Sequence, residues 1–198
     1  MIIYFDTETT GLRPGKICQL SYIIQTKEKI IPKNFFFKVD YIEPSAIAVH
    51  GFTPEKLNIL SGGKIFEDFA EEIKNDFSSA DLIVAHNFNF DQMFMCAEFT
   101  YIYDTFKFKD SFCSMKKFTP ICRLTRSDNV RYKYPKLCEL CEYLDIYSYD
   151  ISRTSIELFG TAASSHDARY DTVALFLAMN KSYDTIPEMA GIKEKLCL

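Results

Sequence analysis

The chain has 198 residues, 47% hydrophobic and 25% charged, a composition typical of one globular domain, which we expect to span residues 1–198. It contains no apolar run near the roughly 18 residues of a membrane span and no secretory signal pattern at its N-terminus. The net charge of −4 argues against a protein that coats nucleic acid by electrostatic attraction alone.

The first elements along the chain are predicted to be strands. Runs rich in β-branched and aromatic residues occupy 1–8, 17–25 and 34–40, and they follow one another at the spacing of hairpins. This pattern predicts three antiparallel strands.

Two helices are expected next. Residues 53–60 have Thr53 in the N-cap position and Pro54 as the first helical residue. In 66–77 the apolar residues recur at intervals of three and four, which is the signature of an amphipathic helix.

The second half of the chain alternates short strands with helices. We predict strands at 81–86 and 108–113 and helices at 91–103, 135–144 and 167–180, the last of them apolar nearly all round. The whole order predicts an α/β fold. Its mixed sheet has three antiparallel strands followed by two parallel ones, with helices on its faces.

Positive charge is concentrated in residues 107–136. This basic segment has a charge of +7, which leaves −11 for the remainder of the chain. Such asymmetry suits either an anion-facing patch or a solvated surface loop. Residues 114–134 within it are predicted to be a long functional loop or a partly mobile one. Its nine cationic residues are Lys107, Lys109, Lys116, Lys117, Arg123, Arg126, Arg131, Lys133 and Lys136.

Two acids lie close together at the end of the first predicted strand. Asp6 and Glu8 share one face because residues two apart in a strand point the same way. Paired carboxylates repel each other unless a cation such as Mg²⁺ or Mn²⁺ lies between them. The alternative is that both simply face water at a strand end.

Two later stretches add further acids at the ends of elements. "HNFNFD" (86–91) presents Asp91 at a strand-to-helix turn, and "SSHDARYD" (164–171) presents His166 and Asp171 around the start of the last predicted helix. Ligands commonly gather at strand-to-helix turns of α/β sheets. Taken singly, Asp91 is also consistent with a helix cap. His166 and Asp171 together are also consistent with an ordinary capping network.

Taken together, the motifs "FDTETTGL", "HNFNFD" and "HDARYD" resemble those of the DEDDh 3′–5′ exonucleases, the superfamily of the proofreading epsilon subunit, RNase T and oligoribonuclease. "IAVHGFTPEKL" (47–57) and "FKDSFCSM" (108–115) resemble further segments of that family. The resemblance covers about residues 1–180 and implies a ribonuclease H-like fold.

The resemblance also implies a mechanism. The ligands of two Mg²⁺ or Mn²⁺ ions would be Asp6, Glu8, Asp91 and Asp171, with His166 as the general base. Asp171 is preferred to Asp167 because the family leaves four residues between the histidine and the acid. The expected reaction is hydrolysis of terminal phosphodiesters of nucleic acid, with single-stranded DNA or 3′ ends as substrate and nucleoside monophosphates as product.

The resemblance further implies a pocket for the terminal nucleotide, with apolar and aromatic groups for base stacking. Ordinary roles stay open: Leu12 and Phe90 as core residues, and His50 as a cap of the following turn. The implied pocket residues are Thr9, Thr10, Gly11, Leu12, Val49, His50, Asn87 and Phe90.

Other functions are compatible with the same motifs. The chain suits a non-catalytic module that binds 3′ ends, a module associated with a polymerase or another replication or repair protein, or an exoribonuclease that trims RNA. The sequence does not predict the oligomeric state. The seven cysteines are odd in number and scattered, which favours free thiols and a cytoplasmic location.

Overall fold

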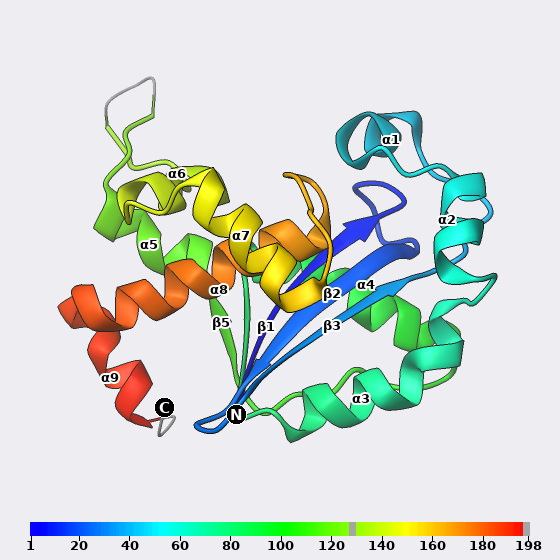
Figure 1. Cartoon of the computed structure of the whole chain (residues 1–198), viewed down its shortest axis with the longest axis horizontal. Helices are drawn as coiled ribbons and strands as arrows, with labels where there is room; N and C mark the ends of the chain where they lie inside the picture. Colours follow the sequence, from blue (N-terminus) through cyan, green and yellow to red (C-terminus); the bar gives the residue numbers. More distant parts are fainter. Residues whose placement is uncertain (127–129, 196–198) are drawn as a thin grey trace.

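The computed structural model describes residues 1–126 and 130–195 (Figure 1). Asp128, in the basic segment, and Cys197 lie outside the described residues. The strands are β1 (Ile2–Thr9), β2 (Ile17–Gln25), β3 (Ile30–Phe36), β4 (Leu82–Ala85) and β5 (Ser111–Cys113). The helices are α1 (Pro44–His50), α2 (Pro54–Ser61), the 3₁₀ turn η1 (Phe66–Phe69), α3 (Ala70–Ser79), α4 (Phe88–Tyr101), α5 (Ser114–Cys122), α6 (Leu137–Tyr143), α7 (Ser148–Phe159), α8 (Ala168–Thr185) and α9 (Pro187–Lys195).

The strands form one mixed sheet in the order β3-β2-β1-β4-β5. β1 pairs antiparallel with β2, and β2 with β3, whereas β4 and β5 join in parallel. The predicted ribonuclease H-like fold class is therefore confirmed. β1 lies in the middle of the sheet, so its C-terminal end is surrounded by other elements.

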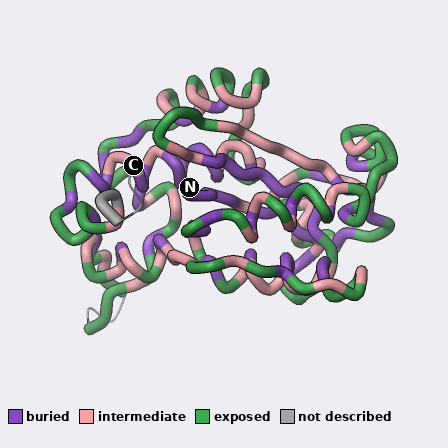
Figure 2. Tube along the Cα trace, turned by 90° about the horizontal axis from the view of Figure 1, so that it is seen from below, coloured by how far each residue is buried: buried purple, intermediate pink, exposed green. Residues whose placement is uncertain are grey.

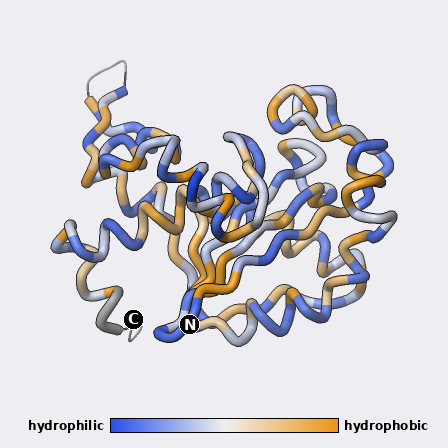
Figure 3. Tube along the Cα trace, in the orientation of Figure 1, coloured by the Kyte–Doolittle hydropathy of each residue, from blue (hydrophilic) through white to orange (hydrophobic). Residues whose placement is uncertain are grey.

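The sheet is buried on both faces. Ile2 and Tyr4 of β1 pack in a core with α5, α6 and α8, while Ile3 and Phe5 pack in another with α3 and α4. Figure 2 shows the buried strands running between helices with exposed outer surfaces, and Figure 3 shows the same strands as the most hydrophobic part of the chain. Even-numbered residues of β1 therefore face α8, and odd-numbered ones face α4.

The third strand was predicted with the wrong bounds. It spans Ile30–Phe36 rather than 34–40, because a turn closed by the Thr26 N–H and the Lys29 carbonyl (3.0 Å) starts it earlier. Pro32 obscured this strand in the sequence. Proline lacks a donor for a sheet ladder, but β3 is an edge strand with one side unpaired, so it is tolerated there.

The prediction of a loop at 114–134 was wrong in its first part, where α5 forms. Pro120 lies inside this helix and masks it, but Phe118 and Cys122 still reach the core on one helical face. α1, α7 and α9 were not predicted. α1 buries no residue, so it carries no strong apolar periodicity, whereas α7 is amphipathic but buries only Ile151 and Ser155.

The cysteines of the described residues are all unpaired, as predicted. The cytoplasmic location inferred from them stays a prediction. No helix in the described part of the chain is long and apolar enough to cross a membrane.

Candidate active site

The C-terminal end of β1 carries two acids on the face covered by α8. Asp6 is half-buried and Glu8 is buried, and both side chains project from the same side of the strand. The pairing of β1 with β2 changes register between Glu8 and Thr9. Such bulges often occur near active sites and redirect side chains.

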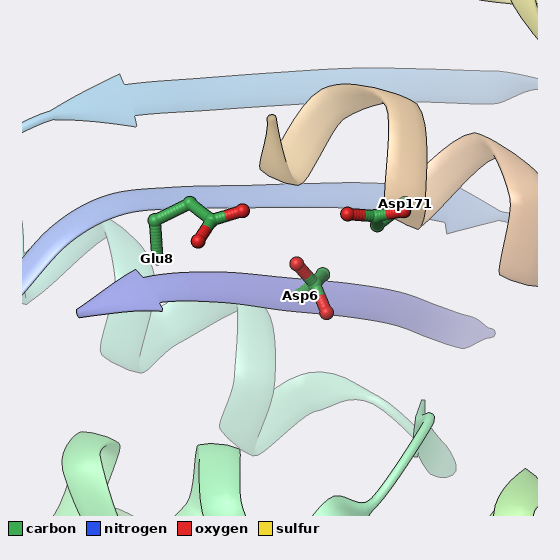
Figure 4. Close-up of side chains that lie close together, drawn as sticks. All are labelled: Asp6, Glu8 and Asp171. Carbon is green, nitrogen blue, oxygen red and sulfur yellow. The ribbon is translucent and has the colours of Figure 1, made fainter. Parts of the chain in front are cut away.

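The third acid of this cluster comes from α8. The carboxylates of Asp6, Glu8 and Asp171 each have an oxygen within 4.8 Å of the others. Figure 4 shows the three carboxylates pointing into a common space between β1 and the first turns of α8. Residues 165 positions apart in the sequence thus meet because α8 packs across β1. We refer to Asp6, Glu8 and Asp171 as the acid cluster.

Asp91 approaches the acid cluster from the opposite face of the sheet. It lies in the first turn of α4, is 2% exposed, and accepts a hydrogen bond of 2.8 Å from the hydroxyl of Thr7. It is outside the group of oxygens within 4.8 Å, but its charge contributes to the pKa of Asp6. The sequence analysis missed Thr7, because alternation along β1 directs it away from Asp6 and Glu8.

Asp167 has a different role from Asp171. Its carboxylate accepts hydrogen bonds from the Arg169 guanidinium at 2.6 and 2.9 Å and from the Gln19 amide at 2.9 Å. Burial by itself raises the pKa of Asp167, but these hydrogen bonds outweigh it and lower that pKa. Asp167 therefore has its own cation, whereas Asp171 belongs to the acid cluster.

The pKa values of the clustered acids are raised. Burial is the largest cause for each. Repulsion from neighbouring carboxylates adds to it for Asp6, whose pKa lies well above its usual range, and for Glu8, whose pKa rises to about 8. The pKa is about 7 for Asp91 and about 6 for Asp171, although the hydrogen bonds to Thr7 and to the His166 backbone oppose the rise.

His166 lies in the loop before α8. It is exposed, its backbone has a φ of 64°, and its N–H donates to an oxygen of Asp171 at 3.1 Å. His166 and Asp171 are thus joined through the backbone N–H of His166, and the imidazole takes no part in this hydrogen bond. His166 also repels His50, and this adds to burial in lowering the pKa of His50.

A pocket of about 310 Å³ adjoins Glu8. It contains six of the predicted pocket residues, and Leu12 and Val49 in it are 78% and 55% exposed, which excludes a core role for Leu12. The sequence analysis missed Ser45 and Ala46, which come from the unpredicted helix α1. The lining is Thr7, Glu8, Thr9, Gly11, Leu12, Ser45, Ala46, Val49, His50 and Phe90. We call this the terminal pocket.

His50 also has the capping role that the sequence left open. Its Nδ1 accepts the Phe52 N–H at 3.1 Å, and its Nε2 lies 3.2 Å from the Thr9 carbonyl. The imidazole thereby joins the start of α2 to the end of β1. Phe90 is half-buried and packs against Phe94, with ring centroids 5.0 Å apart.

Two predicted pocket residues do not line the terminal pocket. The Thr10 hydroxyl accepts the Lys16 N–H at 3.1 Å and so closes the loop between β1 and β2. Asn87 is the N-cap residue of α4, in the left-handed conformation with a φ of 70°. Asparagine tolerates that conformation better than most residues. This backbone requirement accounts for an asparagine before α4 without a role in substrate binding.

A larger pocket of about 780 Å³ lies on the other side of the acid cluster. α6, α7, α8 and the His166 loop surround it, and Asp6 and Asp171 lie at its acidic end. His86 and Lys136 also line it. The sequence analysis assigned His86 no role and named Lys136 only as a member of the basic segment. We call this the helical pocket.

The acid cluster has the chemistry of a site for divalent metal ions. Three carboxylates converge without a Lys or Arg ion pair to any of them among the side chains of residues 1–126 and 130–192. Hard cations such as Mg²⁺ and Mn²⁺ prefer such oxygen ligands, and their binding would remove the repulsion that raises these pKa values.

Comparison with known protein families identifies the fold and the class of chemistry. The exonuclease family model RNase_T matches residues 3–179, which is most of the chain. The chain belongs to this exonuclease family. The resemblance to the DEDDh, DnaQ-like 3′–5′ exonucleases is thereby confirmed at the level of the family.

The individual curated relatives have low sequence identity to this chain. It is 28% identical to DNA polymerase III subunit epsilon of Salmonella typhimurium over 123 residues, which are 57% of this chain and 49% of the relative. For the same subunit of Escherichia coli the identity is 28% over 131 residues, covering 61% and 52%. The chain thus spans about half the length of the curated relatives it matches.

A solved structure supports the fold. A metal-free crystal structure of an E. coli ExoI–ssDNA complex superposes with a TM-score of 0.65 and 19% identity, covering 95% of this chain and 40% of that one. The ribonuclease H-like arrangement of this domain therefore recurs inside a larger exonuclease.

Proposed function

We propose that this exonuclease removes nucleoside monophosphates from the 3′ ends of single-stranded nucleic acid by a reaction that depends on two divalent metal ions. The acid cluster carries this proposal. It adjoins a pocket of about 310 Å³ on one side and a pocket of about 780 Å³ on the other, so a phosphate held there has room for chain on both sides.

The proposed ligands are Asp6, Glu8, Asp91 and Asp171. Two Mg²⁺ or Mn²⁺ ions would neutralise the scissile phosphate, activate the attacking water and stabilise the leaving oxygen. The hydrogen bond from Thr7 fixes the orientation of Asp91, and the backbone N–H of His166 does the same for Asp171. These contacts prepare the carboxylates to bind cations in one geometry.

His166 is the proposed general base. Its exposed imidazole has no hydrogen bond to another residue in the described part of the chain, apart from that of its backbone N–H. Histidine exchanges protons near neutral pH, which suits the removal of a proton from water. Replacing His166 by Ala should lower the turnover rate by about 10²–10⁴.

The terminal pocket is proposed to hold the last nucleoside. Leu12, Val49 and Phe90 offer apolar surfaces on which any base stacks, so recognition would not depend on the sequence of the substrate. Thr9 is fixed by the hydrogen bond from its hydroxyl to the Gly11 carbonyl at 2.9 Å, which shapes the wall next to Glu8. Thr10 and Asn87, which lie outside the pocket, are proposed to support its walls.

The basic segment is proposed to guide the strand toward the acid cluster. Part of its charge is neutralised within the protein, since Lys109 pairs with Asp81 and Lys133 with Glu139. Lys116 contacts the Asn89 side chain at the start of α4, and Lys136 lines the helical pocket. These two lysines are therefore the best candidates for phosphate contacts.

The decisive experiment follows the degradation of 5′-labelled single-stranded DNA and RNA of equal sequence in Mg²⁺ or Mn²⁺. The wild-type protein is compared with Asp6→Ala and with Asp81→Ala, a matched change at the opposite end of the sheet. We expect a ladder that shortens from the 3′ end with the wild type and Asp81→Ala, and none with Asp6→Ala or EDTA.

Each outcome of this assay has a clear meaning. The faster ladder identifies the preferred sugar. Cleavage inside the strand, or cleavage that persists in EDTA, refutes the proposed mechanism. Absence of cleavage by folded wild-type protein that binds Mn²⁺ refutes the proposal in favour of a module that only binds 3′ ends.

The relatives also favour a protein partner, because two of them are named as subunits of DNA polymerase III. We propose that this domain acts with a polymerase or another replication or repair protein. If so, a replicative polymerase should raise its rate on a mismatched primer end, whereas an unchanged rate would favour a separate enzyme.

A further inference from the structure

His86 is a half-buried histidine that the proposed reaction does not use. It follows β4 directly and makes a hydrogen bond with each of its ring nitrogens. Nδ1 lies 2.9 Å from the hydroxyl of Ser114, and Nε2 lies 3.0 Å from the carbonyl oxygen of Pro135. The ring therefore connects the end of one central strand to two points of the basic segment.

The partners of His86 determine its tautomer. A carbonyl oxygen can only accept, so Nε2 carries a hydrogen and donates it to Pro135. In the neutral ring Nδ1 then accepts from the Ser114 hydroxyl. Burial, opposed by the Pro135 contact, lowers the pKa of His86 to about 4, so the ring is neutral at pH 7.

The two residues that His86 contacts, Ser114 and Pro135, lie at the start of α5 and just before α6. Ser114 begins α5, and Pro135 lies two residues before α6, in the connection of residues 123–136 between the two helices. Ser114 and Pro135 are both buried, whereas the next residue, Lys136, is exposed. A fixed Pro135 carbonyl therefore determines where Lys136 leaves the core.

Lys136 is the cation of the basic segment that shares a pocket with members of the acid cluster. It lines the helical pocket together with Asp6 and Asp171. Its ammonium group forms no ion pair with the side chains of residues 1–126 and 130–192. Its backbone N–H is used, since it donates to Glu139 at 2.8 Å and caps α6. The side chain is thus available for an anion.

We infer that His86 is a positioning residue, which holds Lys136 at the edge of the acid cluster so that Lys136 contacts a phosphate of the single-stranded substrate. This inference rests on the proposed function. It assigns to His86 a role in substrate affinity rather than in the chemical step, and it explains why a buried imidazole joins β4 to the basic segment. Without the Pro135 contact, the segment before α6 would lose the bond that fixes its path.

Two conservative substitutions separate the contacts of His86. The amide of Gln reaches the place of Nε2, so His86→Gln keeps a donor to Pro135 and loses the Ser114 contact. The amide of Asn reaches only the place of Nδ1, so His86→Asn keeps an acceptor for Ser114 and loses the Pro135 contact. The two variants have the same polarity, and a general loss of stability would affect both.

The assay measures KM and kcat on a 5′-labelled single-stranded oligodeoxynucleotide and on the p-nitrophenyl ester of dTMP, which has no chain beyond one nucleotide. With His86→Asn we expect KM for the oligonucleotide to rise about threefold to tenfold, the range of one net hydrogen bond, with kcat nearly unchanged. KM for the ester should not change. With His86→Gln both substrates should behave as with the wild type.

Salt dependence and a double variant test the link to Lys136. His86→Asn and Lys136→Ala should each reduce the slope of log kcat/KM against log salt by about one. In the Lys136→Ala background, His86→Asn should have no further effect on KM, because the contact is already lost. Lys29→Ala, in the turn between β2 and β3, controls for the loss of one surface charge.

Several results would overturn the inference. These are an unchanged KM with His86→Asn, an equal effect of His86→Gln, or a further rise of KM in the Lys136→Ala background. The ester distinguishes this failure from failure of the proposed function. If wild-type protein cleaves neither substrate in Mn²⁺, the proposed function fails. If it cleaves both and KM does not respond to His86→Asn, only the positioning role fails.

Discussion

Replacing Asp6 by Asn is expected to make the metal-free protein more stable while abolishing its activity. The reason is that Asp6 contributes a charge to a cluster in which carboxylate oxygens lie within 4.8 Å of one another. Burial, and then repulsion from Asp91, Asp171 and Glu8, raises the pKa of Asp6 well above its usual range. Asn has nearly the same shape but no charge, so the substitution removes the repulsion without leaving a cavity.

The size of the effect follows from Coulomb's law. Two unit charges at the 4.8 Å limit of the cluster repel by about 1 kcal/mol in water and by about 3 kcal/mol at an effective dielectric constant of about 20. Protonation of neighbouring acids relieves part of this repulsion. We therefore expect Asp6→Asn to raise the free energy of unfolding by about 1–3 kcal/mol, which corresponds to roughly 3–10 °C in Tm for a domain of this size.

The effect should depend on pH in a definite direction. A carboxyl group whose pKa is raised in the folded state stabilises it at low pH, and this contribution is lost as pH rises through the folded pKa. For Glu8 that range runs from 4.5 to about 8. The wild type should thus lose stability between these values without metal. The advantage of Asp6→Asn should be large at pH 8 and small at pH 5.

Thermal unfolding in EDTA and in Mn²⁺ provides the assay. At a Mn²⁺ concentration of about 100 times Kd the wild type should gain about 2.7 kcal/mol. The variant has lost a ligand and should gain less, so the order of stability reverses. In Asp81, hydrogen bonds from the N-terminus and Lys109 lower the pKa to about 2, so Asp81→Asn should lower stability at neutral pH. If Asp6→Asn is less stable than the wild type in EDTA at pH 8, the repulsive cluster is refuted.

Three further predictions concern stability and are measured by urea unfolding. Glu98→Ala should cost about 2–4 kcal/mol, because buried Glu98 accepts the Ile17 N–H at 2.8 Å; a loss below about 1 kcal/mol would contradict this. Tyr22→Phe should cost about 1–3 kcal/mol, because the buried hydroxyl donates to Asp76 at 2.7 Å; Tyr22→Leu controls for ring packing, and its cost should be larger. His86 has a folded pKa of about 4, so its neutral form stabilises the protein above pH 6.5 and this contribution is lost as pH falls. The stability difference between wild type and His86→Gln should therefore shrink from pH 7 to about pH 4.5, and a constant difference would exclude the role of the neutral ring.

The sequence predicted most of the regular elements that bury an apolar face, although not α5, which Pro120 masks. α2 was recognised from Thr53 and Pro54, and the Thr53 hydroxyl does accept the Lys56 N–H at 3.3 Å. α8 was recognised because it is apolar nearly all round. α1, by contrast, buries no residue and so leaves no periodic pattern, yet it supplies one wall of the terminal pocket. A helix that buries no side chain, such as α1, could not be predicted from apolar periodicity.

The sequence by itself determined the order of the five strands and of helices α2, α3, α4, α6 and α8, the shared face of Asp6 and Glu8, and the motifs that resemble an exonuclease. These features depend on residues close together in the chain, where periodicity and capping act. The sequence preferred Asp171 to Asp167 only through its resemblance to the family, and the tertiary structure showed that Asp171 joins the acid cluster while Asp167 pairs with Arg169. It also decided that His86 contacts two separate points of the basic segment. These contacts depend on how α8 and α6 pack on the sheet, and packing brings together residues whose separation in the sequence carries no local signal.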